Sequence, residues 1–236
     1  MRKRSILVLL LLLGCGVVVA KQEAAKPAEH AVPISQEHHH HLILENRYTR
    51  VYEVEVPPHE ATLMHEHDHD YAYVVLGDAD VTNTVAGKAP VKMHLADGTV
   101  NFSRGPFAHI AADDGGTPFR NITIVLLRPQ GELKSLHPTV NAALQSGPSE
   151  VPMMESSEMR ISAVGIASGG SWSPKENGHD RLIILLDKMQ DDGAPREPKA
   201  PTFPAGMLRW IPAGSALTLR NAEESEMKLL VLEFKD

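Results

Sequence analysis

The feature that most constrains the fold is an internal repeat of short apolar segments. Residues 98–127 align without a gap on residues 206–235 when the two halves are shifted by 108 positions. Residues 69–78 align on residues 179–188 at a shift of 110 positions, and the small difference fits an insertion between the segments. Two matches at nearly one offset predict a duplicated domain.

Apolar residues alternate within each half, as in β-strands that bury one face. Tyr52, Val54 and Val56, for example, are predicted to lie on the same face of one strand. Turn residues recur at short intervals, and the best helix candidate, residues 132–145, is interrupted by Pro138. The pattern therefore predicts an all-β protein built from sandwiches or barrels.

The chain begins with a predicted signal peptide over residues 1–20. A basic start is followed by about nine apolar residues and then by small residues. Two cleavages are open: LLGC resembles a bacterial lipobox that would leave Cys15 as a lipidated N-terminus, whereas cleavage after Ala20 would leave no lipid. An uncleaved anchor is disfavoured because GCG breaks the apolar run. Both cleavages predict export to the bacterial periplasm or cell envelope, with membrane contact only through the signal or a lipid anchor.

The rest of the chain divides into a predicted tether and two predicted barrels. Residues 21–41 lack a sustained apolar period, so we expect a flexible tether with His38–His41 as its solvated end. We expect the first barrel over residues 42–140, a linker over residues 141–155 and the second barrel over residues 156–236. The net charge of −7 offers no basic surface, which argues against a nucleic-acid partner.

Three histidines at alternate positions give the clearest chemical signal. His65, His67 and His69 fall on one face of a strand because side chains alternate along it. Imidazoles favour one divalent transition metal, Fe, Zn, Ni, Mn or Cu, over Mg or Ca. The interleaved Glu66, Asp68 and Asp70 are placed to accept hydrogen bonds from ring N–H groups. The alternative is a set of surface histidines on a polar strand.

The residues around these histidines resemble the cupins, a superfamily of small β-barrel proteins. His65 and His67 match the paired histidines of the first cupin motif, and Gly77 matches its closing glycine. Gly98 and His109 match the opening glycine and the histidine of the second motif. The resemblance implies that His65, His67 and His109 are the metal ligands and leave open coordination positions.

The resemblance extends over both halves and implies a bicupin, in which intramolecular duplication produced tandem double-stranded β-helix (jelly-roll) barrels. The second half keeps three motif residues, Pro212, Gly214 and Asn221. It lacks the ligands, because the repeat places Lys175, Asn177 and Leu217 at the positions of the three histidines. We therefore expect one metal per chain, in the first barrel, and a degenerate second barrel without a metal site.

This chain departs from the family pattern at the carboxylate ligand. The glutamate of the first motif falls on Tyr71, and Asp70 is one residue out of register. His69 and Asp70 are therefore the candidates for a fourth ligand, and Tyr71 is the candidate catalytic residue. Gly105-Pro106 reverses the order of the proline and glycine that precede the second-motif histidine in the family.

The resemblance implies two classes of function. A three-histidine site without the glutamate is similar to those of cysteine dioxygenase and diketone-cleaving dioxygenases, which implies a metal-dependent oxygenase of a small molecule. The alternative is a non-catalytic cupin of the cell envelope that binds a metal or a small ligand. Loss of the glutamate removes a proton-transfer group and disfavours oxalate-type chemistry. Because cupins often dimerise by strand exchange, a homodimer is a further expectation.

Overall fold

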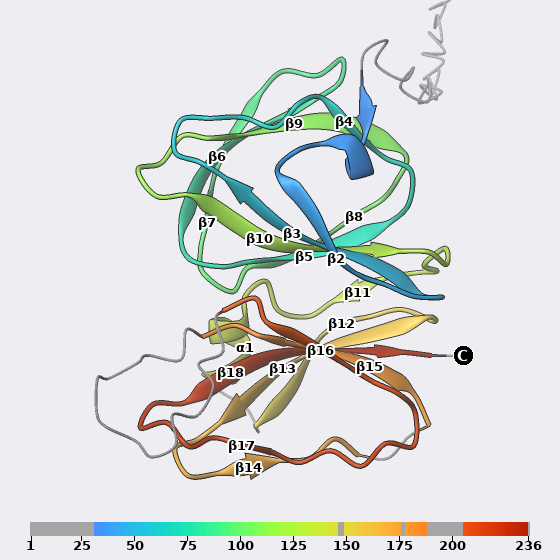
Figure 1. Ribbon diagram of the computed structural model, residues 1–236, viewed down its shortest axis with the longest axis vertical. Coiled ribbons are helices and arrows are strands. Elements are labelled where there is room, and N and C mark those ends of the chain that lie inside the picture. The colour runs from blue at the N-terminus through green and yellow to red at the C-terminus, as the bar shows by residue number, and fades with distance from the viewer. Residues whose placement is uncertain (1–30, 146–148, 176–177, 188–204, 236) are drawn as a thin grey trace, which may run out of the picture.

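The computed structural model describes residues 31–145, 149–175, 178–187 and 205–235 of the 236-residue chain. The predicted signal peptide, including Cys15, lies outside the described residues, as does Asn177. None of the helices in the described part is long and apolar enough to cross a membrane. The described part is nearly all β-structure, as predicted, and forms two stacked barrels (Figure 1).

The first barrel is built from two five-stranded sheets that face each other (Figure 1). One sheet has the order β1 (Val32–Pro33), β4 (His65–His67), β9 (Phe107–Asp113), β6 (Ala79–Val85), β7 (Val91–Leu95). The other has the order β2 (His40–Glu45), β3 (Thr49–Val56), β10 (Phe119–Leu126), β5 (Tyr71–Val75), β8 (Val100–Ser103). Apart from the parallel pair of β1 and β4, the strands of both sheets pair antiparallel, and two such facing sheets are the arrangement of a jelly roll.

The second barrel has one large sheet and one short sheet among the described residues. The large sheet has the order β11 (Lys134–Ser135), β12 (Glu150–Glu155), β13 (Met159–Ile166), β18 (Met227–Phe234), β15 (Asp180–Leu185), β16 (Leu208–Ile211). The short sheet pairs β14 (Ser171–Trp172) with β17 (Leu219–Arg220).

The strand registers repeat between the barrels at the offsets found in the sequence. Strand β10 lies between β3 and β5, just as β18 lies between β13 and β15. Ile122 of β10 is opposite Val74 of β5, and Leu230 of β18 is opposite Ile184 of β15. The two pairs of equivalent residues differ by 108 and 110 positions. The backbone pairing therefore supports the predicted duplication independently of residue type.

The largest apolar core lies between the two barrels, where the sheet that contains β10 packs against the sheet that contains β18 (Figure 1). Ile122 and Ile124 of the first barrel meet Leu230 and Leu232 of the second in this core. Alternate residues of the same strands face the interior of their own barrel. Tyr52, Val54 and Val56 lie together in the interior of the first barrel, which confirms their predicted common face.

Helix α1 (Val140–Leu144) is the part of the predicted helical stretch that becomes helical. It begins directly after Pro138, and Thr139 caps it by accepting a hydrogen bond from the backbone N–H of Ala142 at 3.1 Å. Proline interrupts a helix but is tolerated at or before its first turn, so the helix starts here. Its Val140 is buried in the core between the barrels.

The domain boundaries differ from the predicted ones at both ends of the first barrel. Residues 32–41, predicted as tether, form β1, the 3-10 helix η1 (Ile34–Gln36) and the start of β2. Glu37 and His39 are buried there, contrary to the predicted solvated end. The large sheet of the second barrel begins with β11 at Lys134, and the predicted linker contains α1 and β12. Backbone pairing holds both segments, and the buried carboxylate of Glu37 also holds the first, so apolar periodicity did not reveal them.

Candidate metal centre

Strand β4 places two of the predicted ligands inside the first barrel. Its three residues alternate in burial, so that His65 and His67 point inward and Glu66 is only partly covered. Strand β9 runs antiparallel to β4, and His109 lies directly opposite His65 in this register. Side chains of directly opposed residues project from the same face of a sheet. Two neighbouring strands therefore bring the three histidines together.

The three imidazoles face one another closely. One ring nitrogen from each of His65, His67 and His109 lies within 4.8 Å of the others, and Nε2 of His67 is 3.1 Å from Nε2 of His109. Two nitrogens that bind one metal at about 2.1 Å and roughly at right angles lie about 3.0 Å apart. The spacing therefore fits two ligands of one transition metal.

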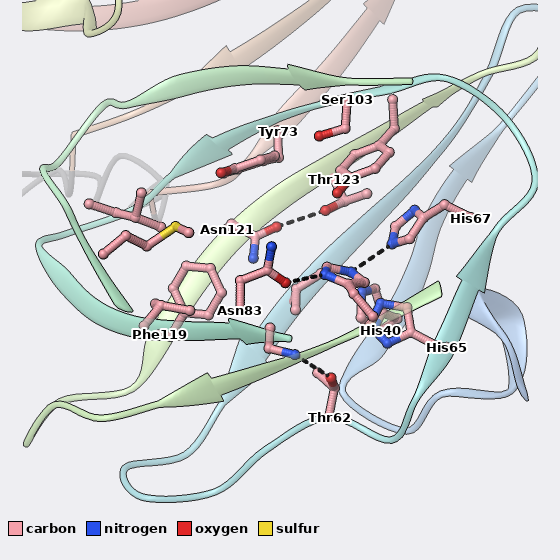
Figure 2. Close-up of a pocket in the computed structure, with 17 residues that line it drawn as sticks. His40, Thr62, His65, His67, Tyr73, Asn83, Ser103, Phe119, Asn121 and Thr123 are labelled. Atoms are coloured by element: carbon pink, nitrogen blue, oxygen red, sulfur yellow. Dashed lines mark hydrogen bonds between the residues drawn. The ribbon is translucent and has the colours of Figure 1, made fainter. Parts of the chain in front are cut away.

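The hydrogen bonds of the other ring nitrogens fix which nitrogen faces the cluster. Nδ1 of His65 donates to the carbonyl oxygen of Leu63 at 2.9 Å. Nδ1 of His109 donates to Oδ1 of Asn83 at 2.8 Å, and Figure 2 shows Asn83 in this bond. Both rings then present Nε2 as a bare lone pair. Nε2 of His65 is buried and has no hydrogen-bond partner among the described residues. Converging lone pairs, one of them without a partner, are the arrangement that a bound cation satisfies.

Burial keeps the three imidazoles neutral. Desolvation lowers the pKa of His65 to about 4 and that of His109 to about 3, and it lowers the pKa of His67 well below its ordinary value. Electrostatic interaction with the neighbouring histidines lowers all three pKa values further. A neutral imidazole is the form that binds a metal. Protons therefore compete little with a metal at neutral pH.

Aromatic packing fixes the ring of His67. Tyr71 stacks on it with a centroid separation of 4.1 Å, and Phe107 stacks at 5.4 Å. The Tyr71 side chain lines the same cavity, and burial raises the pKa of its phenol above the ordinary value of 10.0. The phenol is thus a neutral hydrogen-bonding group beside the cluster. Tyr71 occupies the position where the resemblance places a glutamate.

The three histidines open into a cavity of about 110 Å³ inside the first barrel (Figure 2). Its polar side chains are Thr62, Tyr73, Asn83, Ser103, Asn121 and Thr123, together with the histidines and Tyr71. Its apolar part includes Val54, Val81, Met93, Leu95 and Phe119. The described residues that line it include no Asp, Glu, Lys or Arg. The cavity is therefore small, uncharged and adjacent to the cluster.

The structure does not bring His69 or Asp70 to this cluster. Strand β4 ends at His67, so the alternation that would have turned His69 inward stops there. The His69 side chain is 35% exposed, and its Nδ1 lies 2.7 Å from Oδ1 of Asp68. Asp70 forms an ion pair with Arg104 at 2.8 Å and accepts a backbone hydrogen bond from Gln130 at 3.3 Å. Both candidates for a fourth ligand thus lie elsewhere in the described structure.

Sequence reasoning missed His40, which also lines the cavity. Its ring centroid is 4.6 Å from that of His65, and its Nδ1 lies 2.5 Å from Oε2 of Glu37. Glu37, His38 and His39 also have ligand atoms within 4.8 Å of one another, but the His38 side chain is 60% exposed. In the sequence, His40 is one of four consecutive histidines, and nothing there distinguishes it from its neighbours.

Comparison with known proteins supports the fold. Searches against protein-family models and against curated proteins found no match. The solved structure of AerE from Microcystis aeruginosa is 11% identical, covers 84% of this chain and 97% of its own, and has a TM-score of 0.54. A cupin 2 conserved barrel domain protein from Leptotrichia buccalis is 14% identical, covers 83% of this chain and 88% of its own, and has a TM-score of 0.52.

A salicylate 1,2-dioxygenase from Pseudaminobacter salicylatoxidans has a similar fold. It is 14% identical, covers 82% of this chain and 75% of its own, and has a TM-score of 0.54. At these identities the likeness concerns the fold. The protein has the cupin fold, in the form of two tandem barrels, and its first barrel carries a three-histidine cluster suited to one transition metal.

Proposed function

We propose that this protein is a metal-dependent oxygenase that acts on a compact, uncharged, oxygen-bearing molecule. The observation that carries the proposal is the cluster of His65, His67 and His109, whose Nε2 atoms converge beside an uncharged cavity. Three protein ligands leave coordination positions free, which is the feature of a catalytic rather than a closed structural centre.

The chain itself would hold and shield the reaction. His65, His67 and His109 would hold one divalent transition metal, with Leu63 and Asn83 fixing the orientation of two of the rings. A bound metal would supply Lewis acidity and, in the case of iron, one-electron chemistry with O₂. The buried position of the cluster limits the access of bulk water to the reacting molecule.

The cavity residues favour one class of substrate. None of the described lining residues is Lys or Arg, so a substrate carboxylate could pair with the metal but with no cationic side chain of the described lining. The cavity volume of about 110 Å³ is somewhat smaller than the roughly 150 Å³ of an engineered cavity that holds benzene. A small 1,3-diketone, which carries no charge when it enters and offers two oxygens to a metal, suits this cavity better than salicylate does.

Tyr71 is the side chain that we propose to contact the substrate. Its phenol is neutral because burial raises its pKa, so it can donate a hydrogen bond to a substrate oxygen. Tyr71→Phe keeps the stacking on His67 and removes only the hydroxyl. We expect the variant to retain its metal and to lose about tenfold in kcat/KM, the loss that corresponds to one hydrogen bond.

The alternative function is non-catalytic binding of a metal or small ligand. It is favoured by the absence of a carboxylate among the described cavity residues, since that leaves no acidic proton-transfer group.

We also propose that the protein acts after export to the periplasm or cell envelope. The basic and apolar start of the sequence supports this proposal, as does Cys15 at a lipobox-like position.

Oxygen consumption by the iron-loaded protein tests the oxygenase. The mature chain, including residues 31–41, is offered a 1,3-diketone, a thiol, a flavonol and salicylate, with His109→Ala as the metal-deficient control. We expect oxygen uptake with the diketone that His109→Ala abolishes. No uptake with any of the compounds, while metal analysis finds iron bound, would contradict the oxygenase and favour the binding alternative.

A further inference from the structure

The segment before the first barrel is attached to the strand that carries the histidines. Strand β1 pairs in parallel with β4, and Val32 lies beside His65 in that register. The backbone N–H of Val32 donates to the carbonyl oxygen of Met64 at 2.9 Å. The next residues turn through η1 and enter β2 at His40, which lies opposite Val54 of β3. The segment is thus anchored on both sheets of the barrel.

A buried carboxylate holds this segment at the cluster. Oε1 of Glu37 accepts a hydrogen bond from the backbone N–H of Leu63 at 3.2 Å, and Oε2 accepts one from the backbone N–H of His39 at 3.0 Å. Oε2 also lies 2.5 Å from Nδ1 of His40. The Glu37 side chain is fully buried and that of His40 is only 5% exposed. Glu37 therefore ties His40 to the residue two positions before His65.

This contact determines which nitrogen of His40 is available. A carboxylate accepts the proton on Nδ1, so the neutral ring presents Nε2 as a lone pair. His40 lines the cavity, and its ring centroid lies 4.6 Å from that of His65 and 6.5 Å from that of His67 (Figure 2). A carboxylate that orients a histidine in this way is a recurring support of metal ligands.

We propose that His40 is the fourth ligand of the metal centre and that Glu37 is the positioning residue that orients it. The inference rests on the proposed metal site. The imidazole of His40, which lies outside the motifs, would take the place of the motif carboxylate, whose position in the sequence is occupied by Tyr71. In the described structure His40 lies next to the cluster of His65, His67 and His109. We expect its Nε2 to become a ligand when the metal binds. Four nitrogens still leave open positions on a six-coordinate metal such as iron.

The test counts imidazoles at the metal by pulsed electron paramagnetic resonance of the full mature chain loaded with one equivalent of Cu²⁺. His40→Phe retains a ring against His65 while removing the ligand, and we expect its count to fall from four to three. A competition assay measures Zn²⁺ affinity, and we expect Glu37→Gln to weaken it by about 10–100-fold. The double variant His38→Ala/His41→Ala is the matched control, because both residues are exposed members of the same run.

The outcomes separate this inference from the proposed function. If His40→Phe keeps the imidazole count and the Zn²⁺ affinity of the wild type, the inference is overturned. If the double variant instead loses an imidazole, the histidine run binds metal without a defined geometry, which also overturns it. His67→Ala reports on the three-histidine site alone. Retention of stoichiometric metal by His67→Ala would remove the proposed function itself, whatever His40→Phe does.

Discussion

Acidification is expected to destabilise the metal-free protein strongly between pH 7 and pH 5. The unfolded state binds a proton on each histidine below its ordinary pKa of 6.5, whereas the folded state keeps His65 neutral down to about 4 and His109 down to about 3. Stability is therefore full above pH 6.5 and falls as the pH decreases towards these values. Each of the two groups contributes a loss of about 2 kcal/mol between pH 7 and pH 5.

His67 adds to this loss, because its pKa is also lowered well below the ordinary value. Glu37 has a pKa lowered to about 2, so its contribution to stability is lost only below pH 4.5 and stays outside the chosen range. The range from pH 7 to pH 5 therefore reports mainly on buried histidines.

Urea unfolding of the chelator-treated protein, followed by circular dichroism at several pH values, measures this effect. His109→Leu replaces one buried imidazole with an apolar side chain and should reduce the loss between pH 7 and pH 5 by about 2 kcal/mol. His94→Ala, which changes an exposed histidine, should leave the pH dependence unchanged. A wild-type loss below about 1 kcal/mol, or an unchanged loss in His109→Leu, would refute the reasoning.

Three further outcomes are expected. His67→Ala should lose its stoichiometric transition metal, as measured by elemental analysis, whereas His94→Ala should keep it. Leu232→Ala should lower the free energy of unfolding by about 2–5 kcal/mol, because the residue is fully buried between the barrels, while the exposed Val91→Ala should change it by less than about 0.5 kcal/mol in urea titrations. Asp70→Asn should lower the free energy of unfolding by about 1–2 kcal/mol, because it loses the ion pair with Arg104. It should leave the Zn²⁺ affinity unchanged, and a weakened affinity would place Asp70 at the metal.

The duplicated barrel could be predicted because its signal is local and periodic. Alternation of apolar residues depends only on the geometry of a strand, so it placed Tyr52, Val54 and Val56 correctly on one face. The apolar pattern also still repeats at an offset of 108 positions, because Ile122 and Leu230 both have to fill the core between the barrels. Strong packing constraints leave a pattern that a single sequence retains.

The candidate site could be predicted in part. The spacing of His65 and His67 is short enough for strand geometry to decide their orientation, and the resemblance to the cupins supplied His109. The same alternation failed at His69, because β4 ends at His67 and the chain leaves the sheet. It also gave no account of Asp70, whose carboxylate pairs with Arg104, a residue far from it in sequence.

The sequence by itself determined the all-β class, the duplication and the three histidines of the cluster, and it predicted the loss of the ligand positions in the second half. Tertiary structure alone decided that residues 32–41 belong to the barrel, that His40 reaches the cavity and that this cavity carries no charged side chain among its described residues. The physical reason is the range of the contacts. Periodicity records what neighbouring residues share, whereas the contact of His40 with the cluster depends on a buried carboxylate and on pairing between distant strands.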